Sequence, residues 1–454
     1  MFPQLKDSLA FLLPILQPVF NITSAVPGPT VDLGYATYQG AFDSATNITE
    51  FLGSQSYEPR PVLVWFHGGG YASGSASGLL GTDIWDGKYP LTRAKGGLVV
   101  VVVQYRLGMY GFLAGKEVHA AGGANAGIQD QQFSLRWVQE HIHKFGGNPA
   151  DVTIWGLSAG AGSVYQHIVA NGGQTTPALF NTAITSSTFL PPQYAVDDII
   201  CETMFEEALK QTNCDNLDCL RKVDTFTLQR LNANMGVSTL AGTYTFTPVV
   251  DGTLIQQAPA KALAQGKVNG KHLLSVTNSN EGQLFVNVFS TEDDTLDTAF
   301  YLRNAWPKLK DDELARALEL YADLAPIDKA SAIYADVVFV CPTYRLMRAF
   351  DKPYRAQFAV DNALHGFDAG FYFPDLDNLF QRTYSNSVFE DAFASAFTNF
   401  ALAKDPNVKV AEDVTPAWAP WSDDTPFEMV FNKTADGAPD VLSFWQTIAP
   451  SVGQ

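Results

Sequence analysis

Residues 152–164 read VTIWGLSAGAGSV, and this stretch decides the fold. The β-branched and aromatic residues Val152 to Trp155 predict a short buried strand. Gly156-Leu157-Ser158-Ala159-Gly160 follows at once, and Ser163 to Val169 predicts a helix. A tight turn between strand and helix leaves no room for side chains beside its central residue, which explains the flanking glycines. The stretch therefore predicts a strand–turn–helix unit with the hydroxyl of Ser158 exposed at the tip of the turn.

The Gly-x-Ser-x-Gly pattern by itself is a weak signal. The chain contains 36 glycines among 454 residues, and such a chain produces the pattern by accident roughly one time in five. An ordinary glycine-rich turn is therefore the alternative interpretation. The strand before the pattern and the helix after it favour a nucleophile elbow, in which a strained serine stands above the edge of a sheet.

Apolar runs on both sides of this unit predict the rest of the sheet. The predicted strands are Pro61–Phe66, Leu98–Tyr105, Leu273–Thr277 and Tyr354–Val360. The predicted helices are Gly127–Phe145, Asp312–Leu324 and Ala330–Phe350. This alternation predicts an α/β fold with a mostly parallel central sheet flanked by helices. No repeat or low-complexity linker divides the chain, so we expect residues 26–454 to form a single domain.

A second motif, His67-Gly68-Gly69-Gly70, comes just after the predicted strand Pro61–Phe66. Glycines at this place let backbone N–H groups approach a substrate, and the N–H of Ala159 is the remaining donor. A phosphate-binding loop is the alternative, but no Gly-x-Gly-x-x-Gly pattern or downstream Lys-Ser/Thr supports it. The two motifs in this order predict the oxyanion hole and the nucleophile of an α/β-hydrolase fold.

A serine nucleophile needs a general base. In this fold the chain order is serine, then an acidic residue, then histidine. His167 lies on the helix of the serine motif, and His272 lies upstream of the acid candidate. His365 follows the predicted strand Tyr354–Val360 and is the base by elimination and position, with an ordinary surface-loop histidine as the alternative.

The acid that orients the base is less sharply defined by the residues alone. Glu281 lies just past the predicted strand Leu273–Thr277. Asp251 and Asp361 are competing carboxylates. Position alone gives Glu281 only a modest lead.

Long stretches of the chain resemble the type-B carboxylesterases, which include cholinesterases and the large fungal lipases. The likeness covers nearly all of the chain from Pro61 onward. It is carried by FHGGGYASG (66–74), YRLGMYGFL (105–113), the run from 125 to 164, NSNEGQLF (278–285), CPTYRLM (341–347) and LHGFDAGFYF (364–373).

The resemblance implies hydrolysis of small-molecule or lipid esters through an acyl-enzyme, without cofactor or metal. It implies Glu281 as the acid and His365 as the base of the triad. The residues implied to supply the oxyanion N–H groups are Gly69, Gly70 and Ala159. It also implies a structural salt bridge between Arg106 and Asp130.

Two departures from the family pattern stand out. Leu157 occupies a position that is often glutamate, so a buried carboxylate near the serine is absent, and we expect altered pH dependence or substrate preference. Between Gly53 and Pro61 the chain lacks some tens of residues that relatives carry, among them the lid loop of fungal lipases. A shortened variant and a skipped exon would both give this junction. Lid-type activation is not expected, and a catalytically impaired or non-catalytic cholinesterase-like protein is the alternative function.

The charge and the N-terminus bear on partners and location. The net charge of −18 argues against nucleic acid as a partner. Leu9–Phe20 is an apolar stretch of signal-peptide length, too short to span a bilayer, so we expect residues 1–25 to be a signal peptide, the protein to be secreted, and no stable membrane insertion. Sequons for N-glycosylation, meaningful only in the secretory pathway, begin at Asn21, Asn47 and Asn432.

Four cysteines and four phenylalanines complete the predictions. We expect Cys214 and Cys219 to form a local disulfide, and Cys201 and Cys341 to form a second one or to remain buried thiols. None of the cysteines has metal-ligand spacing with histidines. The phenylalanines that could line an acyl pocket, or instead pack into the core, are Phe285, Phe289, Phe371 and Phe373.

Overall fold

The computed structural model describes residues 21–24, 58–78, 84–237, 242–286, 296–376 and 382–445. These residues form a nine-stranded sheet in the order β1-β3-β2-β4-β5-β6-β7-β8-β9. The strands are β1 (Asn21–Ser24), β2 (Arg60–Phe66), β3 (Val99–Val103), β4 (Gly147–Leu157), β5 (Thr182–Ser186), β6 (His272–Asn278), β7 (Tyr354–Phe358), β8 (Phe427–Lys433) and β9 (Pro439–Trp445). All neighbours from β3 to β8 pair in parallel, whereas β1 and β9 pair antiparallel at the two edges. The predicted mostly parallel α/β sheet is confirmed.

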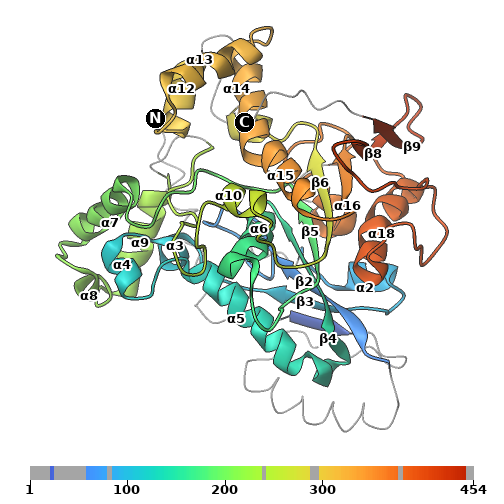
Figure 1. Ribbon diagram of the computed structural model, residues 1–454, viewed down its shortest axis with the longest axis horizontal. Coiled ribbons are helices and arrows are strands. Elements are labelled where there is room, and N and C mark those ends of the chain that lie inside the picture. The colour runs from blue at the N-terminus through green and yellow to red at the C-terminus, as the bar shows by residue number, and fades with distance from the viewer. Residues whose placement is uncertain are drawn as a thin grey trace.

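Helices cover both faces of this sheet (Figure 1). One face packs against α5 (Ala126–His141), α6 (Ala159–Val169), α10 (Pro259–Ala264) and α15 (Cys341–Ala349). The other face packs against α2 (Lys88–Arg93), α16 (Ala369–Tyr372) and α18 (Ser387–Ala403). Successive side chains of a strand point to opposite faces, so Val64 and Phe66 enter the first core while Leu63 and Trp65 enter the second. A strand buried on both faces is usually apolar throughout, which is why the predicted strands read as continuous apolar runs.

Further helices extend beyond the two layers. One group, beside the end of β3, comprises α3 (Gly108–Phe112), α4 (Lys116–Ala120), α7 (Ile199–Thr212), α8 (Leu217–Leu220) and α9 (Thr225–Val237). A second group, at the top of Figure 1, comprises α12 (Thr298–Ala305), α13 (Asp311–Leu320) and α14 (Pro326–Ala335). The short helix α11 (Gln283–Val286) packs against α14. Short helical turns lie at Ile142–Phe145, Ala170–Gly173 and Pro374–Leu376. A π-helical turn, Asp336–Val340, joins α14 to α15 within the stretch predicted as one helix.

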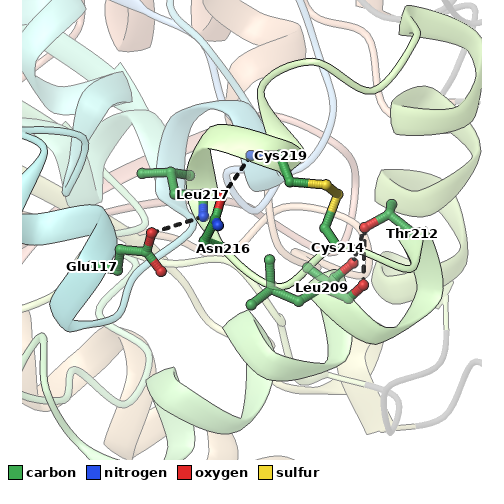
Figure 2. Close-up of a disulfide and its surroundings, with 8 residues drawn as sticks. Glu117, Leu209, Thr212, Cys214, Asn216, Leu217 and Cys219 are labelled. Carbon is green, nitrogen blue, oxygen red and sulfur yellow. Dashed lines mark hydrogen bonds between the residues drawn. A yellow bond between two sulfur atoms is a disulfide. The ribbon is translucent and has the colours of Figure 1, made fainter.

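The predicted disulfide between Cys214 and Cys219 is present and joins the end of α7 to α8 (Figure 2). Within the same loop, the side chain of Asn216 accepts the backbone N–H of Cys219 at 2.8 Å and caps α8. Glu117 of α4 accepts the N–H of Leu217 at 2.9 Å and ties the loop to the neighbouring helix. Cys201 and Cys341 are free thiols, so the alternative of a second disulfide is not realised.

The structure places three of the four candidate pocket phenylalanines. Phe371 and Phe373 lie in the core on the α18 side of the sheet, where Phe373 packs against Trp65 at 4.8 Å between ring centroids. Phe285 lies in the opposite core, and its ring centroid is 5.0 Å from that of His365. Phe289 lies outside the described residues. Of the described three, only Phe285 has a ring contact with His365.

Candidate active site

The candidate site lies at the carboxyl edge of the parallel strands. Ser158 follows β4, His67 follows β2, Glu281 follows β6 and His365 follows β7. Parallel neighbours end at the same edge, and β2 pairs with β4 while β6 pairs with β7. The topology therefore places the glycine motif beside the serine and the acid beside the histidine.

Ser158 has the backbone conformation that the glycine pattern predicts. Its φ and ψ are 58° and −123°, a region that costs a residue with a side chain roughly 1–3 kcal/mol. The turn is closed by contacts that exclude side chains: a Cβ on Gly156 would lie 2.3 Å from the Gly160 backbone, and one on Gly160 would lie 2.0 Å from the Phe66 carbonyl. The Ser158 N–H donates to the carbonyl of Ser186 at 2.9 Å, which fixes the elbow to the end of β5.

The glycine motif is held by its carbonyl groups. The Tyr105 hydroxyl donates to the His67 carbonyl at 2.7 Å, and the Gly69 carbonyl accepts the N–H of Ser73 at 2.9 Å. A planar trans peptide points its N–H opposite its C=O. Tying the carbonyls on one side therefore aims the N–H groups of Gly68 and Gly70 the other way. Gly69 itself adopts φ of 113°, which only glycine reaches without strain.

His67 supports the peptide group between Gly68 and Gly69. Its Nδ1 lies 2.8 Å from the Gly68 carbonyl oxygen, and its ring stacks on Tyr105 with 4.5 Å between centroids. Burial lowers the pKa of His67 to about 4, outweighing the hydrogen bond to Gly68. The neutral ring thus donates from Nδ1 to the carbonyl, so the Gly69 N–H is directed away from His67. The arrangement suits a preorganised oxyanion hole.

Glu281 and His365 form the closest contact between an acidic and a basic side chain in the site. The Nδ1 atom of His365 lies 2.6 Å from Oε2 of Glu281, and the glutamate is fully buried. The two loops are paired just before these residues, because Asn280 and Leu364 form a parallel bridge. The backbone N–H of Asn278 donates to the other Glu281 oxygen at 2.7 Å. Glu281 is therefore bound through both carboxylate oxygens.

The second nitrogen of the His365 ring, Nε2, lies on the side away from Glu281. Among the described residues, Nε2 of His365 is buried and has no partner, so no hydrogen bond to Ser158 is formed. Aromatic rings pack around the imidazole: Phe339 at 4.6 Å and Phe285 at 5.0 Å between centroids. Phe339 belongs to the π-helical turn between α14 and α15.

An aromatic path connects this histidine to the oxyanion motif. Phe339 packs on Phe189 at 5.7 Å, and Phe189 packs on Tyr244 at 5.2 Å. The Tyr244 ring lies against the backbone of Gly70, since a Cβ there would come within 1.9 Å of it. These ring contacts connect His365 with the backbone of Gly70 through apolar side chains.

The competing candidates have other roles in the structure. His167 is buried, its Nε2 lies 3.1 Å from Oε1 of Gln131, and burial lowers its pKa to about 3. His272 begins β6, at the opposite end of that strand from Glu281. Asp251 accepts hydrogen bonds from Asn125 and Thr253, and Asp361 binds Thr383 and Lys433. Within the described ranges, none of these four forms a hydrogen bond or ion pair with Ser158 or Glu281.

The salt bridge implied by the family resemblance is also present. Arg106 donates from Nη2 to Oδ1 of Asp130 at 2.7 Å and from Nε to Oδ2 at 2.7 Å. The backbone N–H of Arg106 also donates to Oδ2 of Asp130, at 3.0 Å. Leu157 is buried in the core beside Trp155, as an apolar residue at that position should be.

Sequence reasoning missed a second buried carboxylate close to the pair. Asp368 is fully buried and accepts a hydrogen bond from Nδ2 of Asn278 at 2.9 Å and another from the Tyr372 hydroxyl. Burial, with repulsion from Glu281, raises the pKa of Asp368 to about 6. Its place three residues after His365 and four before Tyr372 was the only available signal, because its other partner, Asn278, comes from β6.

Two features are absent from the part of the chain that the structure describes. No group of three or more His, Cys, Asp or Glu side chains gathers where a metal ion could be held. No helix there has both the length and the apolar character needed to cross a membrane.

Comparison with known proteins identifies the family of the chain. The family model described as "Carboxylesterase family" matches residues 47–443. The chain is 30% identical to a secreted lipase of Arthroderma benhamiae over 82% of this chain and 72% of that protein. It is 29% identical to carboxylesterase patB of Penicillium expansum, over 77% of this chain and 63% of that protein.

Solved structures of esterases are similar to this chain. The crystal structure of Aspergillus niger EstA superposes with a TM-score of 0.72 at 28% identity, covering 86% of this chain and 78% of EstA. A PNB esterase superposes with a TM-score of 0.69 at 24% identity, covering 86% of this chain and 80% of that one, and supports the fold alone. The chain belongs to the carboxylesterase family.

Proposed function

We propose that this protein hydrolyses carboxylic esters by covalent catalysis, with Ser158 as nucleophile, His365 as base and Glu281 as the acid that orients the base. Family membership supports a hydrolase acting on carboxylic esters. One observation carries the finer proposal: the 2.6 Å contact of His365 Nδ1 with Glu281 leaves Nε2 as the ring atom without a partner. That atom is the one required to take a proton from a serine hydroxyl.

The reaction follows from these positions. As Oγ of Ser158 bonds to the carbonyl carbon, its proton passes to Nε2 of His365, and Glu281 stabilises the resulting imidazolium. The carbonyl oxygen becomes an oxyanion that accepts hydrogen bonds from the N–H groups of Gly69, Gly70 and Ala159. Collapse breaks the bond to the alcohol, which receives the proton from His365. A water molecule then releases the acid by the same steps.

The oxyanion donors are supported by their local structure. Ala159 is the first residue of α6, so its N–H has no acceptor within the helix. The carbonyls that precede the Gly69 and Gly70 amides are already bound by His67 and Ser73. The donors are therefore fixed before a substrate arrives, which is what makes such a site effective.

Labelling with a fluorophosphonate probe tests the nucleophile. We expect one label, at Ser158, located by mass spectrometry, and none in S158A. The control S422A changes a serine in an exposed turn near β8 and should label like the unchanged protein. A folded protein that takes no label at Ser158 would refute the mechanism.

The surroundings of His365 support an ester with an apolar group. Phe285 and Phe339 pack on the imidazole, and neither brings a charge to the place where a substrate must lie. A series of p-nitrophenyl esters of increasing acyl length should be cleaved faster than an ester of a dicarboxylic acid that keeps a free carboxylate. Preference for the charged ester would contradict this part of the proposal.

We also propose that the protein acts outside the cell. Relatives named as secreted include the lipase of Arthroderma benhamiae and secreted lipase 1 of Botryotinia fuckeliana, which is 35% identical over 53% of this chain and 43% of that protein. The Cys214–Cys219 disulfide is compatible with an oxidising compartment. Recovery of the protein from culture medium, with its first residue read by mass spectrometry, tests both secretion and the signal peptide.

A further inference from the structure

Asp368 occupies an unusual place next to the proposed triad. It lies three residues after His365, it is fully buried, and it shares Asn278 as a partner with Glu281. Burying a carboxylate costs free energy, because burial disfavours its charged form. The hydrogen bonds of its two carboxylate oxygens lead to Glu281 on one side and to Ser158 on the other.

One oxygen of Asp368 leads to the acid of the triad. Oδ1 accepts Nδ2 of Asn278 at 2.9 Å, and the backbone N–H of Asp368 donates back to Oδ1 of Asn278 at 3.2 Å. The same asparagine donates its backbone N–H to Oε1 of Glu281 at 2.7 Å. Asp368 thus fixes the residue that holds the Glu281 carboxylate.

The other oxygen leads to the nucleophile. Oδ2 of Asp368 accepts the Tyr372 hydroxyl, whose oxygen lies 3.1 Å from Oγ of Ser186. Trp155 of β4 also donates to Oγ of Ser186, at 3.1 Å. The carbonyl of Ser186 in turn accepts the N–H of Ser158 at 2.9 Å.

We propose that Asp368 is a positioning residue of the catalytic centre: through Asn278 and Tyr372 it holds the Glu281 turn and the end of β5 under Ser158 in register with His365. This inference rests on the proposed esterase function. It assigns Asp368 no contact with the substrate. Its effect reaches the reaction through the placement of the three triad residues.

The network requires the ionised carboxylate. An ionised carboxyl group only accepts hydrogen bonds, whereas protonation turns one oxygen into a donor and displaces Asn278 or Tyr372. The titratable groups facing Asp368 are Glu281, His365 and Tyr372. Burial raises the pKa of Asp368 to about 6, and Glu281 adds to this rise, while the Tyr372 hydrogen bond opposes it. The network should therefore loosen as the pH falls through about 6.

Two isosteric variants test the proposal through kcat, KM and the pH dependence of kcat. We expect D368N and Y372F each to lower kcat about 10-fold at pH 8 with KM within about two-fold, since misplacement of catalytic groups acts on the chemical step. The acid limb, which is the fall of kcat toward low pH, should move in opposite directions in the two variants. D368N removes the titrating carboxylate and shifts the limb to lower pH, whereas Y372F removes a donor that favours ionised Asp368 and shifts it to higher pH.

Matched controls separate positioning from loss of stability. D251N alters another buried aspartate, which binds Asn125 and Thr253 instead of the Asn278–Tyr372 network, and Y384F removes a buried tyrosine hydroxyl without a hydrogen-bond partner in the described ranges. Both should keep kcat and the acid limb unchanged per folded molecule, with folding measured by thermal melts.

Unmoved acid limbs in D368N and Y372F, or kcat losses no larger than those of the controls, would overturn the proposal. If the unchanged protein showed no fluorophosphonate labelling or no ester turnover, the esterase function itself would be rejected.

Discussion

Two buried acid–base pairs lie on neighbouring strands of the sheet, and their surroundings differ. Glu281 and His365 meet beyond the carboxyl ends of β6 and β7, at 2.6 Å. Arg355 and Glu428 meet within β7 and β8, at 3.5 Å, with both side chains 2% exposed. The Tyr344 ring covers the guanidinium at 5.4 Å. Both pairs are enclosed. In the described ranges, Nε2 of His365 has no hydrogen-bond partner, and neither have Nε and Nη1 of Arg355, but only the histidine nitrogen can take up a proton.

The difference shows that burial alone does not mark a catalytic group. Arg355 carries a permanent charge and is held inside the sheet, where its partner compensates that charge. His365 can gain and lose a proton, and it lies at the edge where loops from several strands meet. We therefore expect the first pair to control activity and the second to control stability.

The largest expected effect comes from E281Q. Replacing the carboxylate by an amide removes the charge that stabilises the imidazolium, so kcat for a p-nitrophenyl ester should fall about 10³- to 10⁴-fold. Thermal melts should show a folded protein. A fall of less than about 10-fold would place the orienting acid elsewhere and remove the contrast between the two pairs.

The second largest effect is expected for E428Q, in stability. It leaves the Arg355 charge without a compensating partner, so the unfolding free energy in urea should drop by about 3–5 kcal/mol. Turnover per folded molecule should not change. A double variant, R355M with E428L, removes both charges and should recover most of the loss; failure to recover would mean that packing, and not charge, explains the single variant.

A third test repeats the comparison with two histidines of equal burial. His67 supports the oxyanion motif, whereas His167 lies on α6 against Gln131. H67F should lower kcat about 10- to 100-fold with little change in KM, because the Gly68 carbonyl loses its donor and the Gly69 N–H is no longer fixed. H167F should cost stability but leave kcat per folded molecule intact. Equal kcat losses in H67F and H167F would show that the burial of a histidine, and not its position, determines its effect on activity.

The smallest effect is expected at a half-exposed pair. Arg106 and Asp130 form a bidentate contact, but the arginine side chain is 44% exposed. D130N should therefore lower the unfolding free energy by about 1 kcal/mol or less, and the loss should shrink in high salt. A loss close to that of E428Q would erase the distinction between exposed and enclosed pairs.

Motifs that are local in sequence were predicted well. The elbow around Ser158 and the predicted strand Pro61–Phe66 depend on adjacent residues, and both are present in the structure. β5 was missed because its sequence TAITS has little apolar character, although it is buried in mid-sheet with Thr185 and Ser275 paired at 2.7 Å. The π-helical turn at Asp336–Val340 was missed because its residues continue a helical pattern.

Contacts between distant segments could not be read from the sequence. Glu281 was preferred by position and then implied by family resemblance, and the geometry now favours it over Asp251 and Asp361. The contact of Asp368 with Asn278 joins segments 90 residues apart, which no spacing in the sequence reveals. The pair Arg355–Glu428 depends in the same way on the register of β7 against β8.

The valines of β3 carry a consequence for handling the protein. β3 consists of five consecutive valines, Val99 to Val103, and among the described strands its outer side pairs only with β1. β1 lies within residues 1–25, so removing that stretch would leave the backbone N–H and C=O groups of a valine run open to other chains. Such an edge is a template for intermolecular strand pairing. The processing of the first 25 residues would then decide whether the protein stays dispersed or associates edge to edge.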